Sequence, residues 1–120
     1  MSALYYTTKA KANIYDAVVG VFDELFKELK DLGKKKPETT LSAAKVKIIN
    51  RVLEDVMDCL ENEANFKYLE LLDDETLPQY SDAILILAQF DGALKTFRER
   101  HFGYYGGEHQ WVIRKKEKEE

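Results

Sequence analysis

Apolar residues recur every three or four positions along three stretches of the chain, which is the period of an α-helix that buries one face. The pattern predicts a first helix from residue 2 or 8 to residue 32, a second from about residue 40–42 to residue 60, and a third from residue 76 to about residue 102. In the first helix, the residues expected to face the core are Ala10, Ile14, Ala17, Val18, Val21, Phe22, Leu25, Leu29 and Leu32. In the second helix, they are Leu41, Ala44, Ile48, Ile49, Val52, Leu53, Val56, Cys59 and Leu60.

Glycine, proline and capping residues mark the expected ends of these helices. Gly33 is expected to cap the first helix at its C-terminus, and Pro37 prevents the helix from continuing. Thr76 and Gln79 have the spacing of a capping box, which places the start of the third helix there. Gly20 destabilises a helix interior by about 1 kcal/mol relative to alanine, so we expect it to mark a close helix crossing.

The predicted fold class is all-α, an up-and-down bundle of three long helices in which residues 61–65 either continue the second helix or break it near residue 62. Gly103 is expected to end the third helix, and two aromatic or β-branched runs then flank Gly106 and Gly107. This pattern predicts a short β-hairpin or an extended arm. At this length residues 1–113 make one domain, and the wholly charged residues 114–120 are expected to form a disordered tail.

Residues 81–90 are the most apolar run of the chain. Within this run, residues 83–88 are apolar on every side of a helix, and Leu85 lies on the side that is otherwise polar. In a bundle of three helices, Leu85 and Ala88 would face water. Because an apolar helix surface has to be covered, we expect either the C-terminal segment or a partner to contact these two residues.

Charge is distributed unevenly along the chain, whose net charge is −4. Residues 54–91 contain 11 acidic side chains and one basic side chain, whereas the segments before and after them are mildly basic. One explanation is that neighbouring helices neutralise each other. The alternative is that the acidic block, residues 54–91, presents an electronegative face to a basic partner.

Several function classes are excluded by simple features of the sequence. No apolar run approaches the roughly 20 residues that cross a bilayer, so we expect no membrane partner. The first residues lack the basic and apolar regions of a signal peptide. The single cysteine, Cys59, cannot form an internal disulfide and is expected to be a buried thiol. These features favour a reducing compartment, the cytoplasm.

Carboxylate pairs on the first two helices are the main candidates for catalytic chemistry. Glu24 and Glu28 share one helix face, as do Glu54 and Asp58 on the second helix. Such pairs could hold Mg²⁺ for phosphate chemistry, as they do in all-α nucleotide pyrophosphohydrolases. The Glu-x-x-Glu and Glu-x-x-Asp spacings of those enzymes are missing at these positions, so this reaction stays an alternative. No other catalytic, metal or nucleotide motif is present, and we expect no cofactor.

Basic and aromatic side chains alternate near the C-terminus, a combination that single-stranded nucleic acids bind. The acidic net charge argues against such binding. The aromatic side chains would otherwise pack the C-terminal arm onto the bundle. The basic residues of this nucleic-acid alternative are Lys95, Arg98, Arg100, Arg114, Lys115 and Lys116.

The function that the sequence favours is a non-enzymatic protein–protein interaction module. We expect it to associate with itself as a homodimer and to act as a small adaptor or inhibitor of a larger complex. Two surfaces support this expectation, the surplus apolar face of the third helix and the aromatic arm. The expected contact residues are Leu85, Ala88, Tyr104, Tyr105, Trp111 and Ile113.

Overall fold

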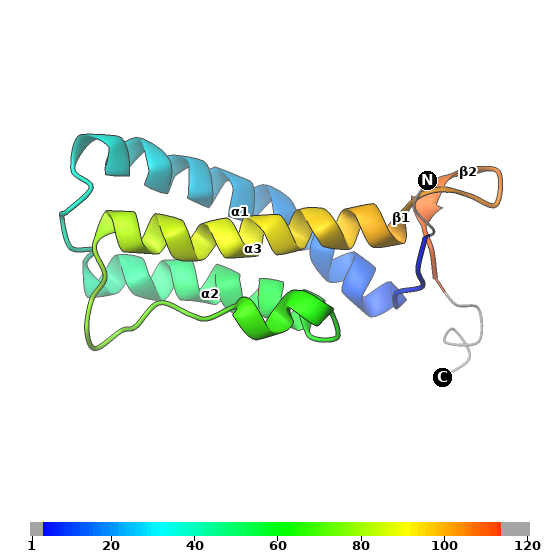
Figure 1. Cartoon of the computed structure of the whole chain (residues 1–120), viewed down its shortest axis with the longest axis horizontal. Helices are drawn as coiled ribbons and strands as arrows, with labels where there is room; N and C mark the ends of the chain where they lie inside the picture. The colour runs from blue at the N-terminus through cyan, green and yellow to red at the C-terminus, as the bar shows by residue number, and fades with distance from the viewer. Residues whose placement is uncertain (1–3, 114–120) are drawn as a thin grey trace.

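A computed structural model describes residues 4–113 as three long helices followed by a two-stranded antiparallel hairpin, which confirms the predicted all-α bundle with a C-terminal hairpin (Figure 1). The molecule is elongated, measuring 49 × 30 × 22 Å. Its elements are α1 (Lys9–Lys35), α2 (Ala43–Leu60), the 3-10 helix η1 (Ala64–Tyr68), α3 (Tyr80–His101), β1 (Phe102–Tyr105) and β2 (Glu108–Trp111). The second predicted helix therefore breaks after Leu60, and η1 follows as a separate turn.

The connection between α2 and α3 sets the direction of the last helix. Residues 61–79 return along the bundle to the end where α2 begins, so α2 and α3 run in the same direction and α1 runs opposite to both (Figure 1). The predicted up-and-down order therefore holds for α1 and α2 but not for α2 and α3, because this long connection reverses the chain once more. Backbone bonds fix this return. Leu41 N–H donates to the Pro78 carbonyl at 2.8 Å, and Tyr80 N–H donates to the Thr39 carbonyl at 3.0 Å.

Polar side chains cap the first two helices where the sequence predicts. Thr8 is the N-cap of α1, and its hydroxyl accepts a hydrogen bond from Lys11 N–H at 3.1 Å. Ser42 does the same for α2 by accepting from Lys45 N–H at 3.2 Å. Each cap satisfies one of the N–H groups that have no partner in the first turn of a helix.

The predicted capping box at the start of the third helix was wrong. The helix begins at Tyr80, and Gln79 is the N-cap residue without a side-chain cap bond. The backbone at Gln79 is extended because it pairs with Thr40 in an antiparallel bridge, so this segment cannot form a helical first turn. At the other end, α3 stops at His101, and Gly103 lies inside β1 rather than at the helix cap.

Two of the glycine predictions were also wrong. Gly33 does not cap α1, because the helix continues to Lys35 and buries this glycine. A Cβ atom at residue 33 would lie 2.5 Å from Cδ1 of Ile84, so the missing side chain lets α3 approach α1 closely. The close crossing expected at Gly20 is absent, since a Cβ atom there would meet nothing within 4 Å.

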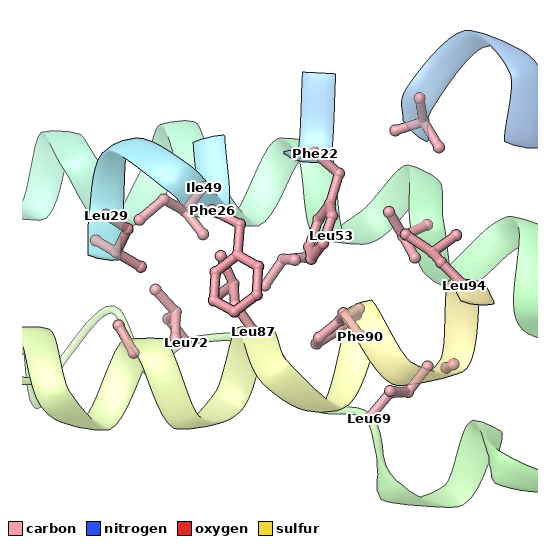
Figure 2. Packing of buried hydrophobic residues seen from close by; sticks show 14 of the residues in the cluster. Phe22, Phe26, Leu29, Ile49, Leu53, Leu69, Leu72, Leu87, Phe90 and Leu94 are labelled. Atoms are coloured by element: carbon pink, nitrogen blue, oxygen red, sulfur yellow. The ribbon is translucent and has the colours of Figure 1, made fainter. Parts of the chain in front are cut away.

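The core lies where α3 rests against α1 and α2, and aromatic and leucine side chains from all three helices fill it. Phe22 from α1, Leu53 from α2 and Phe90 from α3 are each completely buried. Figure 2 shows these side chains converging between the helices, with Leu69 and Leu72 of the return segment beside them. Burying each large apolar side chain contributes about 1.5–3 kcal/mol, so this cluster accounts for the way the helices assemble.

The face of α1 that enters this core is rotated relative to the prediction. The buried residues of α1 are Ala12, Tyr15, Val18, Phe22, Phe26, Leu29 and Gly33. Four residues that were expected in the core, Ala10, Ala17, Val21 and Leu32, are exposed instead. On α2 the same is true of Ala44 and Ile48. Both helices therefore have an additional apolar face that the core does not use.

Candidate interaction surfaces

The unused apolar faces of α1 and α2 meet in a groove of about 710 Å³. Its apolar lining consists of Ile14, Ala17, Val18 and Val21 from α1 and Ile48 and Val52 from α2. A second hollow of about 200 Å³ shares Ile48 and extends past Leu25 and Leu32 to Lys45 and Tyr80. We call the two together the α1/α2 groove.

Large side chains in the α1/α2 groove are exposed to water. Val21 and Ile48 each expose 54% of their surface, and Leu32 exposes 38%. Their neighbours in the sequence, Phe22 and Ile49, expose 0% and 3%. A contiguous apolar surface of this kind on a folded domain marks a binding site more often than a single exposed residue does.

Charged residues border the groove in a defined order along α2. Lys45 lies at one end and Arg51 near the middle, and Glu54, Asp55 and Asp58 follow toward the other end. Glu28 of α1 lines the same hollow as Lys45. Lys45 Nζ donates to the Tyr80 hydroxyl at 2.8 Å. Within residues 4–113, Arg51, Asp55 and Asp58 take part in no side-chain ion pair. The α2 side of the groove therefore changes from basic to acidic along the helix, and Arg51, Asp55 and Asp58 form no ion pair within residues 4–113.

The sequence contains a signal for this groove in the apolar residues of α1. Apolar residues on α1 occupy two adjacent lines, 14–17–21–25–32 and 15–18–22–26–29, each with helical spacing. Together they cover more of the helix surface than one neighbouring helix can bury. The sequence predicts the surplus apolar surface on the third helix, whereas most of the large exposed apolar side chains of the helices lie on α1 and α2.

The predicted contact residues Leu85 and Ala88 are exposed on α3, and Leu85 exposes 66% of its surface. Among residues 4–113 the C-terminal hairpin does not cover them, because it lies at the far end of α3 (Figure 1). The residues one turn away, Ser81 and Gly92, are small and exposed. The apolar surface at Leu85 is therefore a single large side chain rather than a groove.

The aromatic arm forms the predicted hairpin, with a tight turn at Gly106 and Gly107, which have φ values of 63° and 91°. Trp111 packs onto the bundle, and its ring centroid lies 5.1 Å from that of Tyr15 and 5.6 Å from that of Phe97. Ile113 is half-buried and pairs with Thr7 in a parallel bridge.

The other two aromatic residues of the arm, Tyr104 and Tyr105, expose 68% and 40% of their surface. Of the four predicted arm contacts, Trp111 and Ile113 thus pack within the chain. Tyr104 and Tyr105 are exposed, although the Tyr104 ring lies 5.4 Å from that of His109 and Tyr105 shares a side-chain hydrogen bond with Tyr6.

A buried histidine joins three segments beside the hairpin. His101 exposes only 3% of its surface, and its Nδ1 atom lies 2.7 Å from the Tyr5 carbonyl oxygen. Its Nε2 atom lies 3.1 Å from Oε2 of Glu63. Arg100 Nε lies 3.5 Å from Oε1 of the same carboxylate. A histidine that carries protons on both nitrogens donates to both of these acceptors.

Each described basic residue of the nucleic-acid alternative contacts another side chain of the protein. Lys95 pairs with Asp91 at 2.8 Å. The Arg98 guanidinium lies 4.3 Å from the centre of the Phe102 ring, and Arg100 pairs with Glu63. Arg114, Lys115 and Lys116 lie outside the described residues, as does the predicted disordered tail, residues 114–120.

The carboxylate pairs of the pyrophosphohydrolase alternative are not gathered into a site. In residues 4–113, no three side chains from histidine, cysteine, aspartate and glutamate come together in an arrangement that could hold a metal ion. None of the described helices is long and apolar enough to cross a membrane.

No protein-family model, curated protein sequence or solved structure matches this chain. Arguments about function therefore depend on the surfaces of the molecule itself.

Proposed function

We propose that this protein is a non-enzymatic protein–protein interaction module and that the α1/α2 groove is its binding surface. The observation that carries the proposal is the exposure of Val21 and Ile48, each 54% exposed, at the centre of a continuous apolar groove. Complete burial of one such side chain contributes about 1.5–3 kcal/mol. Because each side chain is already nearly half buried, a partner that covers both of them gains about half of that amount from each.

The shape of the groove favours a helix as the bound element. Two antiparallel helices form its walls, and its apolar side chains follow the spacing of helical turns. An amphipathic helix lies in such a groove with its own apolar side chains at every third or fourth position. Binding of this kind fits the adaptor or inhibitor role that the sequence favours.

The proposal is tested with matched substitutions at exposed apolar residues. Val21→Glu and Ile48→Glu each place a charge in the α1/α2 groove, whereas Leu85→Glu makes the same chemical change on α3. All three positions are exposed, so each substitution is expected to change the free energy of unfolding by no more than about 0.5 kcal/mol. Circular dichroism checks that each variant is folded.

The measurement is intermolecular crosslinking in the native host. Lys45 and Lys47 of α2 are exposed, and a lysine-reactive reagent records the protein chains that approach them. Isotopic labelling of half the copies separates crosslinks between two copies from crosslinks within one. We expect intermolecular crosslinks in the wild type and in Leu85→Glu, and their loss in Val21→Glu and Ile48→Glu. Crosslinks that persist in both groove variants but disappear in Leu85→Glu would move the binding surface to α3.

A further inference from the structure

On the premise that the α1/α2 groove is the binding surface, we infer that its occupant is a second copy of this chain, bound with its α2 antiparallel to the first α2. In this arrangement the α1 and α2 helices of the two protomers stack face to face and form the two central layers of the dimer. α3 of each protomer lies on the outer side of these layers, because it packs on the opposite face of α1 and α2 (Figure 1).

The order of charges on α2 is the observation that identifies the occupant. Along the groove, basic Lys45 and Arg51 come first and acidic Asp55 and Asp58 follow. A two-fold axis near residue 51 places Lys45 of each protomer opposite Asp55 and Asp58 of the other. An interface between identical copies has to be self-complementary under such a rotation, and the charges at both ends of α2 satisfy that condition. On the axis itself the two copies of Arg51 face each other, within one helical turn of Glu54 of the opposite protomer.

The distances along the helix agree with this pairing. Lys45 and Asp58 are 13 residues apart, so they are separated by roughly 20 Å along the axis of α2. The exposed Ile48 lies between them, close to the two-fold axis. The two copies therefore bring Ile48 and Val52 close to the axis, where Arg51 and Glu54 of both copies also lie, and they bring opposite charges together at both ends.

A uniformly charged helix fits this groove less well. A basic helix would be attracted by Asp55 and Asp58 but repelled by Lys45 and Arg51, and an acidic helix would experience the reverse. A second copy in the parallel orientation would place like charges together at both ends. Only a helix whose charge changes sign halfway along, bound antiparallel, is attracted at both ends, and α2 is such a helix.

The experiment measures the dimer dissociation constant by sedimentation velocity for charge-reversal variants of α2. Lys45→Glu and Asp58→Lys each replace an attraction with a repulsion at both ends of the antiparallel dimer. We expect each variant alone to dimerise about tenfold more weakly than the wild type. An equimolar mixture of the two variants restores attraction at both ends, so it is expected to dimerise as tightly as the wild type.

Lys47→Glu is the matched control, because it makes the same charge change on α2 at a residue that does not line the α1/α2 groove. We expect it to leave the dissociation constant within about twofold of the wild type. A parallel dimer gives a different result, in which each variant alone equals the wild type and the mixture binds more tightly than the wild type. That outcome, or equal effects of Lys45→Glu and Lys47→Glu, overturns the antiparallel arrangement.

A wild type that stays at the 13.9 kDa mass of one chain at high concentration overturns the second copy as the occupant. Failure of this inference is distinguishable from failure of the proposed function. If the wild type is monomeric but its crosslinks to another protein are lost in Val21→Glu, the groove is a binding surface with a different occupant. If those crosslinks are absent or unaffected, the groove itself is not the binding surface.

Discussion

Cys59 is a residue whose chemistry follows from its position in the bundle. It lies near the end of α2, is completely buried, and donates a weak hydrogen bond from Sγ to the Lys11 carbonyl oxygen at 3.5 Å. Burial disfavours the charged thiolate and raises the pKa of this thiol to about 12. The helical pattern predicts that Cys59 is buried, and the structure confirms this prediction.

This pKa shift predicts a loss of stability at alkaline pH. In the unfolded chain the thiol ionises near its ordinary pKa of 9.0, whereas in the folded protein it stays protonated until about 12. The unfolded state therefore binds fewer protons than the folded state between these values, and the stability that is present below pH 9 is lost as pH rises. From pH 8 to pH 10.5, ionisation of Cys59 in the unfolded chain lowers the free energy of unfolding by about 2 kcal/mol.

Urea denaturation of the wild type and of Cys59→Ala at both pH values measures this effect. The comparison with the variant isolates the contribution of Cys59, including its effect on the raised pKa of Tyr15. We expect the free energy of unfolding to fall by about 2 kcal/mol more in the wild type than in the variant. Equal falls in the two proteins contradict the prediction.

Adjacent residues show why the groove could not be read from the sequence. Val21 and Phe22 are both apolar, and so are Ile48 and Ile49, yet only the second residue of each pair is buried. The helical period does not decide which of two neighbouring apolar lines faces the core. Here the larger Phe22 and Phe26 rings lie in the core, and the rotation that buries them exposes Val21.

At the scale of elements, the segment before α1 and the hairpin after α3 hold each other in place. Tyr5 N–H donates to the Arg100 carbonyl at 2.8 Å, and Thr7 N–H donates to the Val112 carbonyl at 2.9 Å. His101 completes this junction, since its two ring nitrogens face Tyr5 and Glu63. One buried side chain thus links the N-terminal segment and the turn after α2 to the end of α3.

We expect His101→Ala to lower the free energy of unfolding by about 2–4 kcal/mol, because it removes both contacts and leaves a cavity beside the carboxylate of Glu63. His109→Ala is the matched control, because the chain's other histidine is exposed on β2. That variant is expected to change the free energy of unfolding by no more than about 0.5 kcal/mol. Urea denaturation at pH 7 compares the two, and equal effects contradict the role of His101 as a junction.

The sequence predicted the elements themselves better than their ends. Three helices and the hairpin follow from hydrophobic period and from Gly106 and Gly107, which are local signals. The ends at Gly33 and Gln79 depend on distant partners, because Ile84 packs on the first and Thr40 pairs with the second. A capping rule that considers only neighbouring residues cannot include such contacts.

At the scale of the whole molecule, the acidic block of residues 54–91 contains paired and unpaired carboxylates within the described residues. Glu61 and Glu63 pair with Lys11 and Arg100, which come from the basic segments on either side of the block. These pairs agree with neutralisation between neighbouring helices. Asp55 and Asp58 instead border the groove without an ion pair among residues 4–113, and they supply the charge that the proposed dimer uses.

The shape of the molecule makes the proposed dimer distinguishable in solution from other dimers. One chain has a Cα radius of gyration of 16.2 Å and is 22 Å thick along its shortest axis, the direction in which α3 lies on the α1 and α2 layer (Figure 1). Two copies joined through the α1/α2 groove have centres separated by about this thickness. Combining half of that separation with the radius of one chain gives a dimer radius of gyration of about 20 Å.

Two copies joined end to end through Tyr104 and Tyr105 would be separated by about the 49 Å length of the molecule, which gives a radius of gyration of about 29 Å. Small-angle X-ray scattering over a concentration series separates these values. We expect the radius to rise with concentration from that of one chain to about 20 Å in the wild type, and to stay at the single-chain value in Val21→Glu. A radius that approaches 29 Å would instead place the contact at the hairpin, because no side-by-side arrangement of these two elongated molecules is that extended.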